Sequence, residues 1–448
     1  MKKIDLTQGS VAPSLLRFAF PLMIGNLLQQ LYNIVDTLIV GRYVGKTALA
    51  AVGSAYTLMI FLTSIIIGLC MGSGTYLSIQ YGRKDDASFK QSLYLSKVFI
   101  SIVVVVINLL SYLCLSPITS FMNVPSEVAP LFIEYLLIIF GGLIAVFIYN
   151  YISNVLRAVG NSDIPLVFLA VSVITNIVLD IVFVKVFCWG VSGAAWATII
   201  AQYLSAIGIL IYYMKYCSNF KVEKELRKWN PILFQGMANL SLTTCVQQSI
   251  MNFGILMVQG LVNRFGTVIM AAFASGVKID TLAYAPVQDF GNAFSTFIAQ
   301  NHGARQEKRI QHGIKVSAGL VAIFCIIIST FVYFFAGNLM SIFVPSTQQD
   351  VILAGVQYLR IEGVFYIGIG ILFLLYGYYR GIQRAEMSIV LTIISLGLRV
   401  VLAYLLSSIL SVGVVGIWLA IPIGWFVADL VGILYGLYIQ YKQNVIFD

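Results

Sequence analysis

Long apolar runs separated by short polar segments fill the chain from one end to the other. Each run has about 20 residues or more, which at a rise of about 1.5 Å per residue is enough to cross a hydrocarbon layer about 30 Å thick. The pattern predicts an all-α polytopic membrane protein with twelve transmembrane helices, at residues 14–40, 48–80, 92–115, 128–156, 164–187, 191–214, 232–262, 268–300, 314–336, 351–379, 386–410 and 413–440.

The composition agrees with a lipid environment. Of the 448 residues, 60% are hydrophobic and only 10% are charged, and the mean hydropathy is +0.93. Soluble domains are roughly half apolar and one quarter charged, so a soluble fold could not bury this much apolar surface. The first run follows Lys2 and Lys3 but lacks an A-x-A-like cleavage site, and we interpret it as a retained helix.

The net charge of +9 comes from basic residues in short clusters between the runs. This distribution is typical of topology signals, whereas a nucleic-acid surface would form one stripe. If the helices alternate, one side keeps only Arg42, Lys46 and Arg264, with Lys185 near a helix end. The positive-inside rule then predicts the cytoplasmic (inner) membrane with both termini in the cytoplasm.

The longest charged connection divides the chain almost in half. We expect six-helix lobes at residues 1–215 and 232–448, joined by a cytoplasmic linker at residues 216–231. Because each lobe has an even number of helices, the two lobes run parallel and are related by a pseudo-two-fold axis along the membrane normal.

An internal repeat supports this division. A shift of roughly 220 residues superposes Val124-Pro125-Ser126 on Val344-Pro345-Ser346, and Gly45 on Gly266. Two such bundles can expose a central cleft alternately to each side of a membrane, which favours a transport function.

Polar side chains inside the runs are few, and each costs about 2.5 kcal/mol or more at mid-membrane. Asp36 lies deep in the first run, and Asn176 and Asp180 share one stripe of the fifth run at i,i+4. Carboxylate and amide oxygens bind small hard cations, and two adjacent carboxyls favour proton exchange. Thr198 in the sixth run adds a hydroxyl, so these residues are candidates for a proton or Na+ site.

Four motifs resemble those of multidrug and toxic compound extrusion (MATE) transporters. They are PLMIGNLLQQLYNIVDTLIVGRYVG followed by ALAAVG, LRAVGNSDIPL, GVSGAAWAT and AQNHGARQ, and with the duplication the resemblance covers essentially the whole chain. It implies a secondary active antiporter that exports small organic compounds, cationic or amphiphilic and drug-like, in exchange for H+ or Na+ by alternating access.

The resemblance also implies roles for single residues. In the branch related to DNA-damage-inducible exporters, Asp36, Asn176, Asp180 and Thr198 match the ion-coupling positions, with possible Na+ binding, and Asn154 matches a polar neighbour. Another branch carries its acids in helices 7 and 10. Here helix 7 has Gln247 and Gln248 at that point and the corresponding stretch of helix 10 has no acid, so we expect coupling through the first lobe.

Candidates for substrate contact are less specific, and core packing is the alternative role for each. Lys278 and Asp280 are two residues apart, so they do not face each other on a helix. Aromatic, amide and methionine side chains suit varied flat or cationic molecules. The candidates of these types are Tyr32, Gln248, Met251, Met257 and Tyr284. Arg360 with Glu362 and Arg399 with Asp429 are expected to be structural ion pairs.

Other function classes fit less well. Six scattered cysteines without C-x-x-C and two histidines indicate neither a disulfide framework nor a His/Cys metal site. Without a catalytic cluster near an interface we expect no enzyme and no cofactor beyond the coupling ion, and we expect a monomer with no nucleic-acid partner. The alternative is a lipid or lipid-linked oligosaccharide flippase, although such a protein would be expected to have a more basic cleft and often extra helices.

Overall fold

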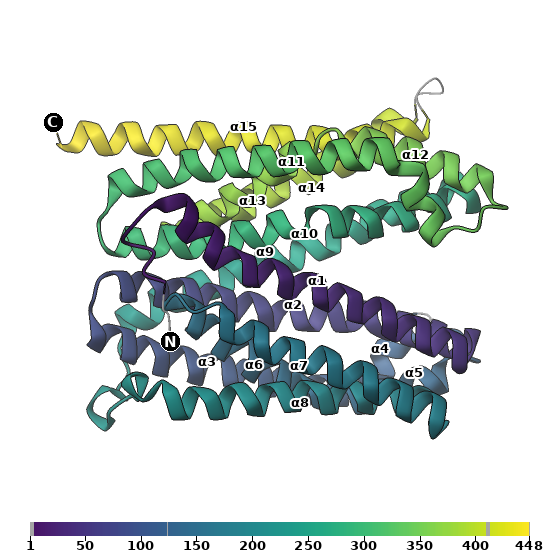
Figure 1. The fold of residues 1–448 in the computed structure, drawn as a ribbon, viewed down its shortest axis with the longest axis horizontal. Helices are drawn as coiled ribbons and strands as arrows, with labels where there is room; N and C mark the ends of the chain where they lie inside the picture. Colours follow the sequence, from purple (N-terminus) through teal and green to yellow (C-terminus); the bar gives the residue numbers. More distant parts are fainter. Residues whose placement is uncertain (1–3, 123, 409–412, 448) are drawn as a thin grey trace. The chain divides into compact units, whose positions relative to one another are not determined.

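The computed structural model describes residues 4–122, 124–408 and 413–447, without the side chains of residues 46, 253–257, 259, 260, 263 and 443–447. Each of the twelve predicted runs is mainly helical where the structure describes it, and the described residues form no strand, so the predicted all-α fold class is confirmed (Figure 1). The α-helices are α1 (Val11–Tyr43), α2 (Lys46–Gly82), α3 (Asp86–Leu113), α4 (Leu115–Phe121), α5 (Ala129–Ile139), α6 (Leu143–Ala158), α7 (Asp163–Asp180), α8 (Gly190–Tyr216), α9 (Pro231–Val262), α10 (Thr267–Gly303), α11 (Glu307–Phe343), α12 (Gln349–Gly363), α13 (Tyr366–Gly381), α14 (Ala385–Ser407) and α15 (Val414–Phe447).

Three spans depart from a regular helix. The fourth predicted run contains a 3-10 turn at Phe140–Gly142 between α5 and α6, and the fifth continues from α7 into a π-helix at Ile181–Val186. The tenth bends by 52° between α12 and α13. Among the described residues, ten spans and this bent pair are long and apolar enough to cross a membrane. Together with α9, whose side chains are described only in part, they match the twelve predicted spans.

The chain forms two compact units. The first contains Phe20–Cys245 and the residues up to Asp5, and the second contains Leu6–Ala19 and Val246–Asp448. The division therefore falls inside α9, past the predicted linker at residues 216–231. This happens because the first half of α9 packs on helices of the first unit. The predicted lobe boundaries and their symmetry axis stay predictions.

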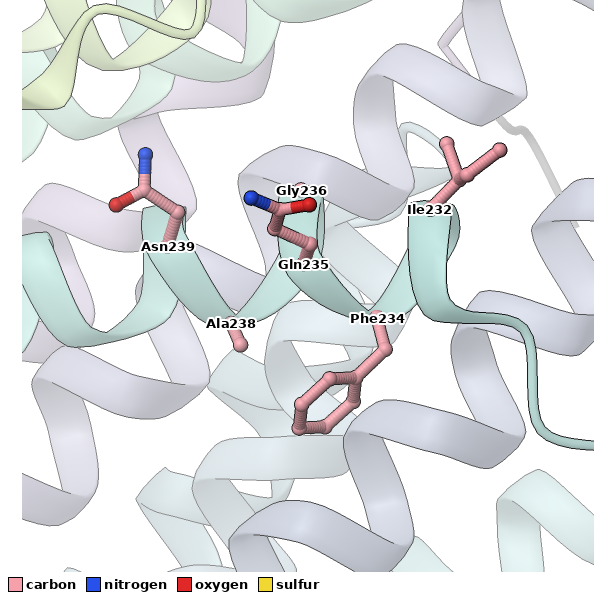
Figure 2. A pocket seen from close by; sticks show the side chains of 6 residues that line it. All are labelled: Ile232, Phe234, Gln235, Gly236, Ala238 and Asn239. Atoms are coloured by element: carbon pink, nitrogen blue, oxygen red, sulfur yellow. The ribbon is translucent and has the colours of Figure 1, made fainter.

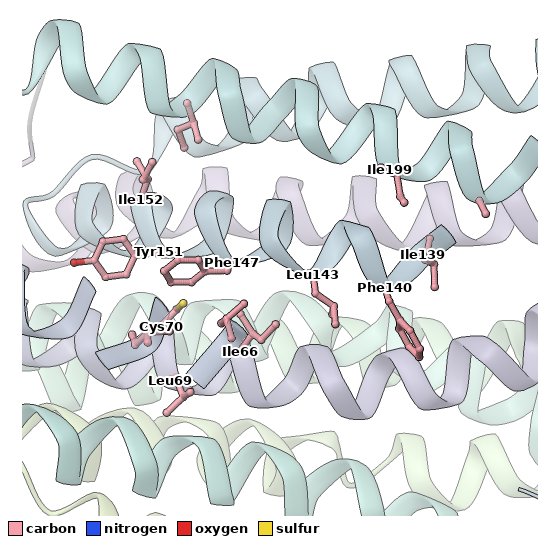
Figure 3. Close-up of a cluster of buried hydrophobic side chains, with 14 of the residues drawn as sticks. Ile66, Leu69, Cys70, Ile139, Phe140, Leu143, Phe147, Tyr151, Ile152 and Ile199 are labelled. Atoms are coloured by element: carbon pink, nitrogen blue, oxygen red, sulfur yellow. The ribbon is translucent and has the colours of Figure 1, made fainter. Parts of the chain in front are cut away.

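The core of the first unit lies where α2 meets α5 and α6. Ile66 and Cys70 of α2 lie on the side that faces the buried rings of Phe147 and Tyr151 of α6 (Figure 3). This packing buries large apolar side chains between α2 and α6, and the burial stabilises the contact between these two helices.

Small residues let α2 approach a neighbouring helix closely. A Cβ added at Gly68 would lie 2.5 Å from Cys245 Cα, and one at Gly72 would lie 2.5 Å from Ser241 Cα. Both glycines therefore place α2 directly against the α9 backbone. The repeat also recurs in the backbone, because Gly45 and Gly266 precede α2 and α10 with φ of +113° and +90°.

Candidate functional site

Three helices of the first unit bring together the predicted ion-coupling residues. Asp36 lies on α1, Asn176 and Asp180 on the last turns of α7, and Thr198 on α8; all are buried, and Asp180 is 0% exposed. The Asn176 amide Nδ2 donates to Thr198 Oγ1 over 3.3 Å. The carboxyls of Asp36 and Asp180 lie within hydrogen-bonding reach of each other.

Several oxygens of this cluster lack a hydrogen-bond donor. Among the described residues, no donor reaches Asp36 Oδ1, Asn176 Oδ1 or either carboxyl oxygen of Asp180. Buried polar atoms nearly always have partners, and an unpaired buried charge is costly. A proton or a small cation would satisfy these oxygens, so the arrangement can bind either one.

Tyrosine hydroxyls line the same cluster. The Tyr32 side chain hydrogen-bonds Thr198 and lies beside both carboxyls, and Tyr135 lies beside both carboxyls from α5. Tyr32 was predicted as a substrate contact, whereas its described neighbours belong to the ion-coupling cluster. Tyr135 was not predicted, because a tyrosine in an apolar run carries no signal that tells a site from core packing.

The backbone beside Asp180 is unusual. Asp180 ends the regular part of α7, and the six residues that follow form the π-helix. Single π-helical turns inside transmembrane helices occur frequently at functional sites. The π-helix therefore starts directly after Asp180, whose two carboxyl oxygens both lack a hydrogen-bond donor among the described residues.

Asn154 has other contacts. Its Nδ2 donates to the carbonyl of Asn150 over 2.8 Å, and its Cβ packs against Gly74 of α2. Its role as a polar neighbour of the ion site stays a prediction.

The second unit contains a separate buried carboxyl pair. Asp280 of α10 interacts with Glu362 of α12, accepts a hydrogen bond from the Tyr366 hydroxyl, and lies near the Arg399 guanidinium. The pairing expected from the sequence is therefore wrong in two places. Arg360 stacks over Tyr333 instead of pairing with Glu362, and Arg399 interacts with Asp280 and Glu362 while Asp429 lies elsewhere.

The remaining substrate candidates are spread over the second unit. Lys278 is exposed over the Phe343 ring, at 5.9 Å from its centroid, and so does not face Asp280. The Tyr284 ring lies 6.1 Å from that of Phe373. Met257 is on α9, but its side chain lies outside the described residues.

Gln248 and Met251 do line a common cavity. It also contains Gln247, Gln288, Asn292, Phe373, Tyr376 and Arg380, all from the second unit. A larger cavity of about 550 Å³ runs along the start of α9 in the first unit, where Gln235 and Asn239 present their amides and Phe234 its ring (Figure 2). None of the residues lining the larger cavity was predicted.

A polytopic helical membrane protein with buried polar residues inside its spans has the features of a membrane transporter. The sequence profile of the MatE family matches residues 21–182 and 240–405, and the chain belongs to this family of multidrug and toxic compound extrusion proteins. The resemblance seen in the motifs is thus confirmed, and the chain is a transporter and not an enzyme.

Individual relatives cover nearly the full chain. The chain is 29% identical to the probable multidrug resistance protein YpnP of Bacillus subtilis (strain 168), with 100% of this chain and 99% of YpnP covered. It is 26% identical to the probable multidrug resistance protein YoeA of the same organism, with 97% and 95% covered. A crystal structure of MATE in complex with MaL6 superposes with a TM-score of 0.93, covering 99% and 100% of the chains; at 22% identity this is a likeness of fold.

Proposed function

We propose that this protein is a multidrug exporter of the cytoplasmic membrane that exchanges a small organic compound for H+ or Na+ by alternating access. Both termini face the cytoplasm, and the protein acts as a monomer without a further cofactor. The family membership and the names of YpnP and YoeA support the export of drug-like compounds. The observation that carries the proposal of ion coupling is that four acceptor oxygens of Asp36, Asn176 and Asp180 have no donor among the described residues.

Coupling requires that the ion and the substrate prefer different states of the transporter. An ion bound between Asp36 and Asp180 cancels one of two like charges in contact, and so favours the state in which the two carboxyls lie together. A substrate that favours the other state then lowers the affinity for the ion, and the ion lowers the affinity for the substrate by the same factor.

The experiment is efflux of a fluorescent organic cation from cells or vesicles under an imposed H+ or Na+ gradient, with the other gradient clamped. We expect Asp36→Asn and Asp180→Asn to reduce gradient-driven efflux at least about tenfold, within the range of typical coupling energies. Asp163→Asn is the matched control, because it makes the same change at an exposed position of α7, the helix that carries Asp180. Full gradient-driven efflux by both site variants contradicts the proposal.

A further inference from the structure

Arg380 is a buried cation in the second unit that has only neutral partners. It lies in the last turn of α13 and is 5% exposed. Its Nε donates to Ser295 Oγ over 3.1 Å, and its Nη2 donates to Asn292 Oδ1 over 3.0 Å. Among the described residues, no carboxylate interacts with this guanidinium.

A buried charge is normally paired, because burial removes the water that would otherwise solvate it. A position near a helix C-terminus can stabilise a cation, but these two hydrogen bonds go to side chains of α10 and not to carbonyls of α13. The guanidinium has five N–H donors, and the interactions with Ser295 and Asn292 use only part of them. Among the described residues, Nη1 has no hydrogen-bond acceptor and is not fully enclosed, so it remains a donor that an added ligand can reach.

The guanidinium faces the small cavity lined by Gln247, Gln248, Gln288 and Asn292. Asn292 turns its oxygen toward Arg380, so its Nδ2 group remains a donor for another partner. The amides of Gln247 and Gln288 supply donors as well, and the rings of Phe373 and Tyr376 form an apolar side. No residue lining this cavity is acidic.

The cavity has a volume of about 10 Å³, which is roughly the space of one water molecule. This size fits a single-atom anion or one end of a carboxylate. A guanidinium with converging amide N–H groups is the donor set that recognises such groups by charge-assisted hydrogen bonds.

We propose that Arg380, Asn292 and Gln288 form a binding site for a small anionic group, either free chloride or the carboxylate of an exported organic acid. The site would extend the substrates beyond the cationic compounds expected from the sequence. The part that concerns an exported acid rests on the proposed export function, whereas anion binding itself does not.

The test measures anion binding to the purified protein in detergent through its thermal unfolding. Sodium gluconate, whose hydroxylated chain does not suit the apolar side formed by Phe373 and Tyr376, is replaced by chloride or benzoate at constant ionic strength. We expect a saturable rise in melting temperature for the wild type. Arg380→Gln should weaken the apparent affinity at least about tenfold, because it removes the charged donor. Arg384→Gln, which removes an exposed arginine four residues further on, should behave as the wild type.

A second variant keeps the test valid if Arg380→Gln does not fold. Gln288→Glu places a carboxylate in the cavity at nearly unchanged volume. It should unfold at a higher temperature than the wild type in gluconate and show no further shift with chloride. A response to chloride alone assigns the site to the free ion, and competition between benzoate and chloride assigns it to a carboxylate. No anion response in the wild type, or a response that Arg380→Gln retains in full, overturns the proposal, and neither result depends on transport.

Discussion

Asp180 has the least satisfied side chain of the ion-coupling cluster. It is completely buried, both of its carboxyl oxygens lack a donor among the described residues, and the Asp36 carboxyl lies against it. Two carboxylates in contact repel each other unless a proton or a cation lies between them. Asn176 and Thr198 add a neutral oxygen and a hydroxyl, which is the ligand chemistry that Na+ and other hard cations accept.

Thr198→Val tests the supporting residues. The variant keeps the branched shape but removes the acceptor of the Asn176 amide and the partner of the Tyr32 hydroxyl. One hydrogen bond is worth about 1 kcal/mol, so we expect the apparent affinity for the coupling ion to fall about fivefold. The measurement is the ion concentration that gives half-maximal efflux from vesicles.

Thr37→Val is the control for this variant. The Thr37 hydroxyl donates to the Asn33 carbonyl on an exposed part of α1, outside the cluster. This control should leave the half-maximal ion concentration unchanged. An unchanged value for Thr198→Val as well would show that the hydroxyl does not support the ion site.

The sequence predicted part of this cluster. The i,i+4 spacing put Asn176 and Asp180 on one stripe of α7, and Asp36 and Thr198 were chosen as polar residues inside apolar runs. The family resemblance then matched all four to ion-coupling positions. The positions of Tyr32 and Tyr135 could not be predicted, because contacts between helices depend on how each helix rotates about its axis. The same limit explains why the predicted pair of Arg360 and Glu362 was wrong. Glu362 is close to Arg360 in sequence, but its side chain faces Asp280 on another helix.

At the scale of the helices, prediction was more complete. Twenty apolar residues can satisfy their backbone in lipid only as a helix, so hydropathy alone predicted where the long helices of the described residues lie. The bend between α12 and α13 and the π-helix after Asp180 were not predicted. Both are local changes of backbone geometry within runs whose side chains stay apolar.

Gly72→Ala should destabilise the close contact between α2 and α9. The added Cβ would lie 2.5 Å from Ser241 Cα, which is backbone and cannot move aside, and overpacking of this kind costs about 1–3 kcal/mol. The measurement is unfolding of the purified protein by an increasing fraction of denaturing detergent. Gly53→Ala is the control, because a Cβ there meets no atom within 4 Å. Equal stability of the two variants would contradict the packing described here.

The cap at the start of α3, outside the membrane-spanning segments, should make the stability of the protein depend on pH. The Asp85 carboxylate caps this helix by accepting from Ser88 N over 3.0 Å, and the hydrogen bonds from the Ser88 side chain and backbone hold the pKa of Asp85 below its usual value. Because the folded pKa is depressed, the stabilisation is present above the unfolded pKa of about 3.9 and is lost as the pH falls through the folded pKa.

Asp85→Ala should therefore lower stability by about 0.5–2 kcal/mol at pH 7, and the difference from the wild type should disappear in acid. Detergent unfolding at a series of pH values measures both effects. A difference that stays constant down to pH 3 would show that the carboxylate does not act as the cap.

At the scale of the whole chain, the two halves repeat in backbone but not in chemistry. Asp36, Asn176 and Asp180 align near Met257, Arg399 and Ala403 of the second half. In the first unit the carboxyl pair has no cation near it among the described residues, whereas in the second unit Arg399 lies beside Asp280 and Glu362. A carboxyl pair that already has an arginine has less need of a coupling ion, which favours coupling through the first unit.

The membrane topology gives a further prediction at this scale. Cys188 is exposed in the connection between α7 and α8, which the distribution of basic residues places outside the cytoplasm. With the other five cysteines replaced by alanine, a membrane-impermeant maleimide should label Cys188 in intact cells. A Lys224→Cys variant without Cys188 should be labelled only after permeabilisation. The reverse labelling pattern would show that the α7–α8 connection faces the cytoplasm, opposite to the predicted topology.

The most direct measurement of the central claim is ion release on substrate binding to the purified protein. Protons are followed with a pH indicator and Na+ with a radioactive tracer, while a transported organic compound is added. The account predicts that the wild type releases one of the two ions as the compound binds, and that Asp36→Asn and Asp180→Asn release neither. Release by both variants at the wild-type level would contradict it, because the ion would then be held outside the Asp36 and Asp180 cluster.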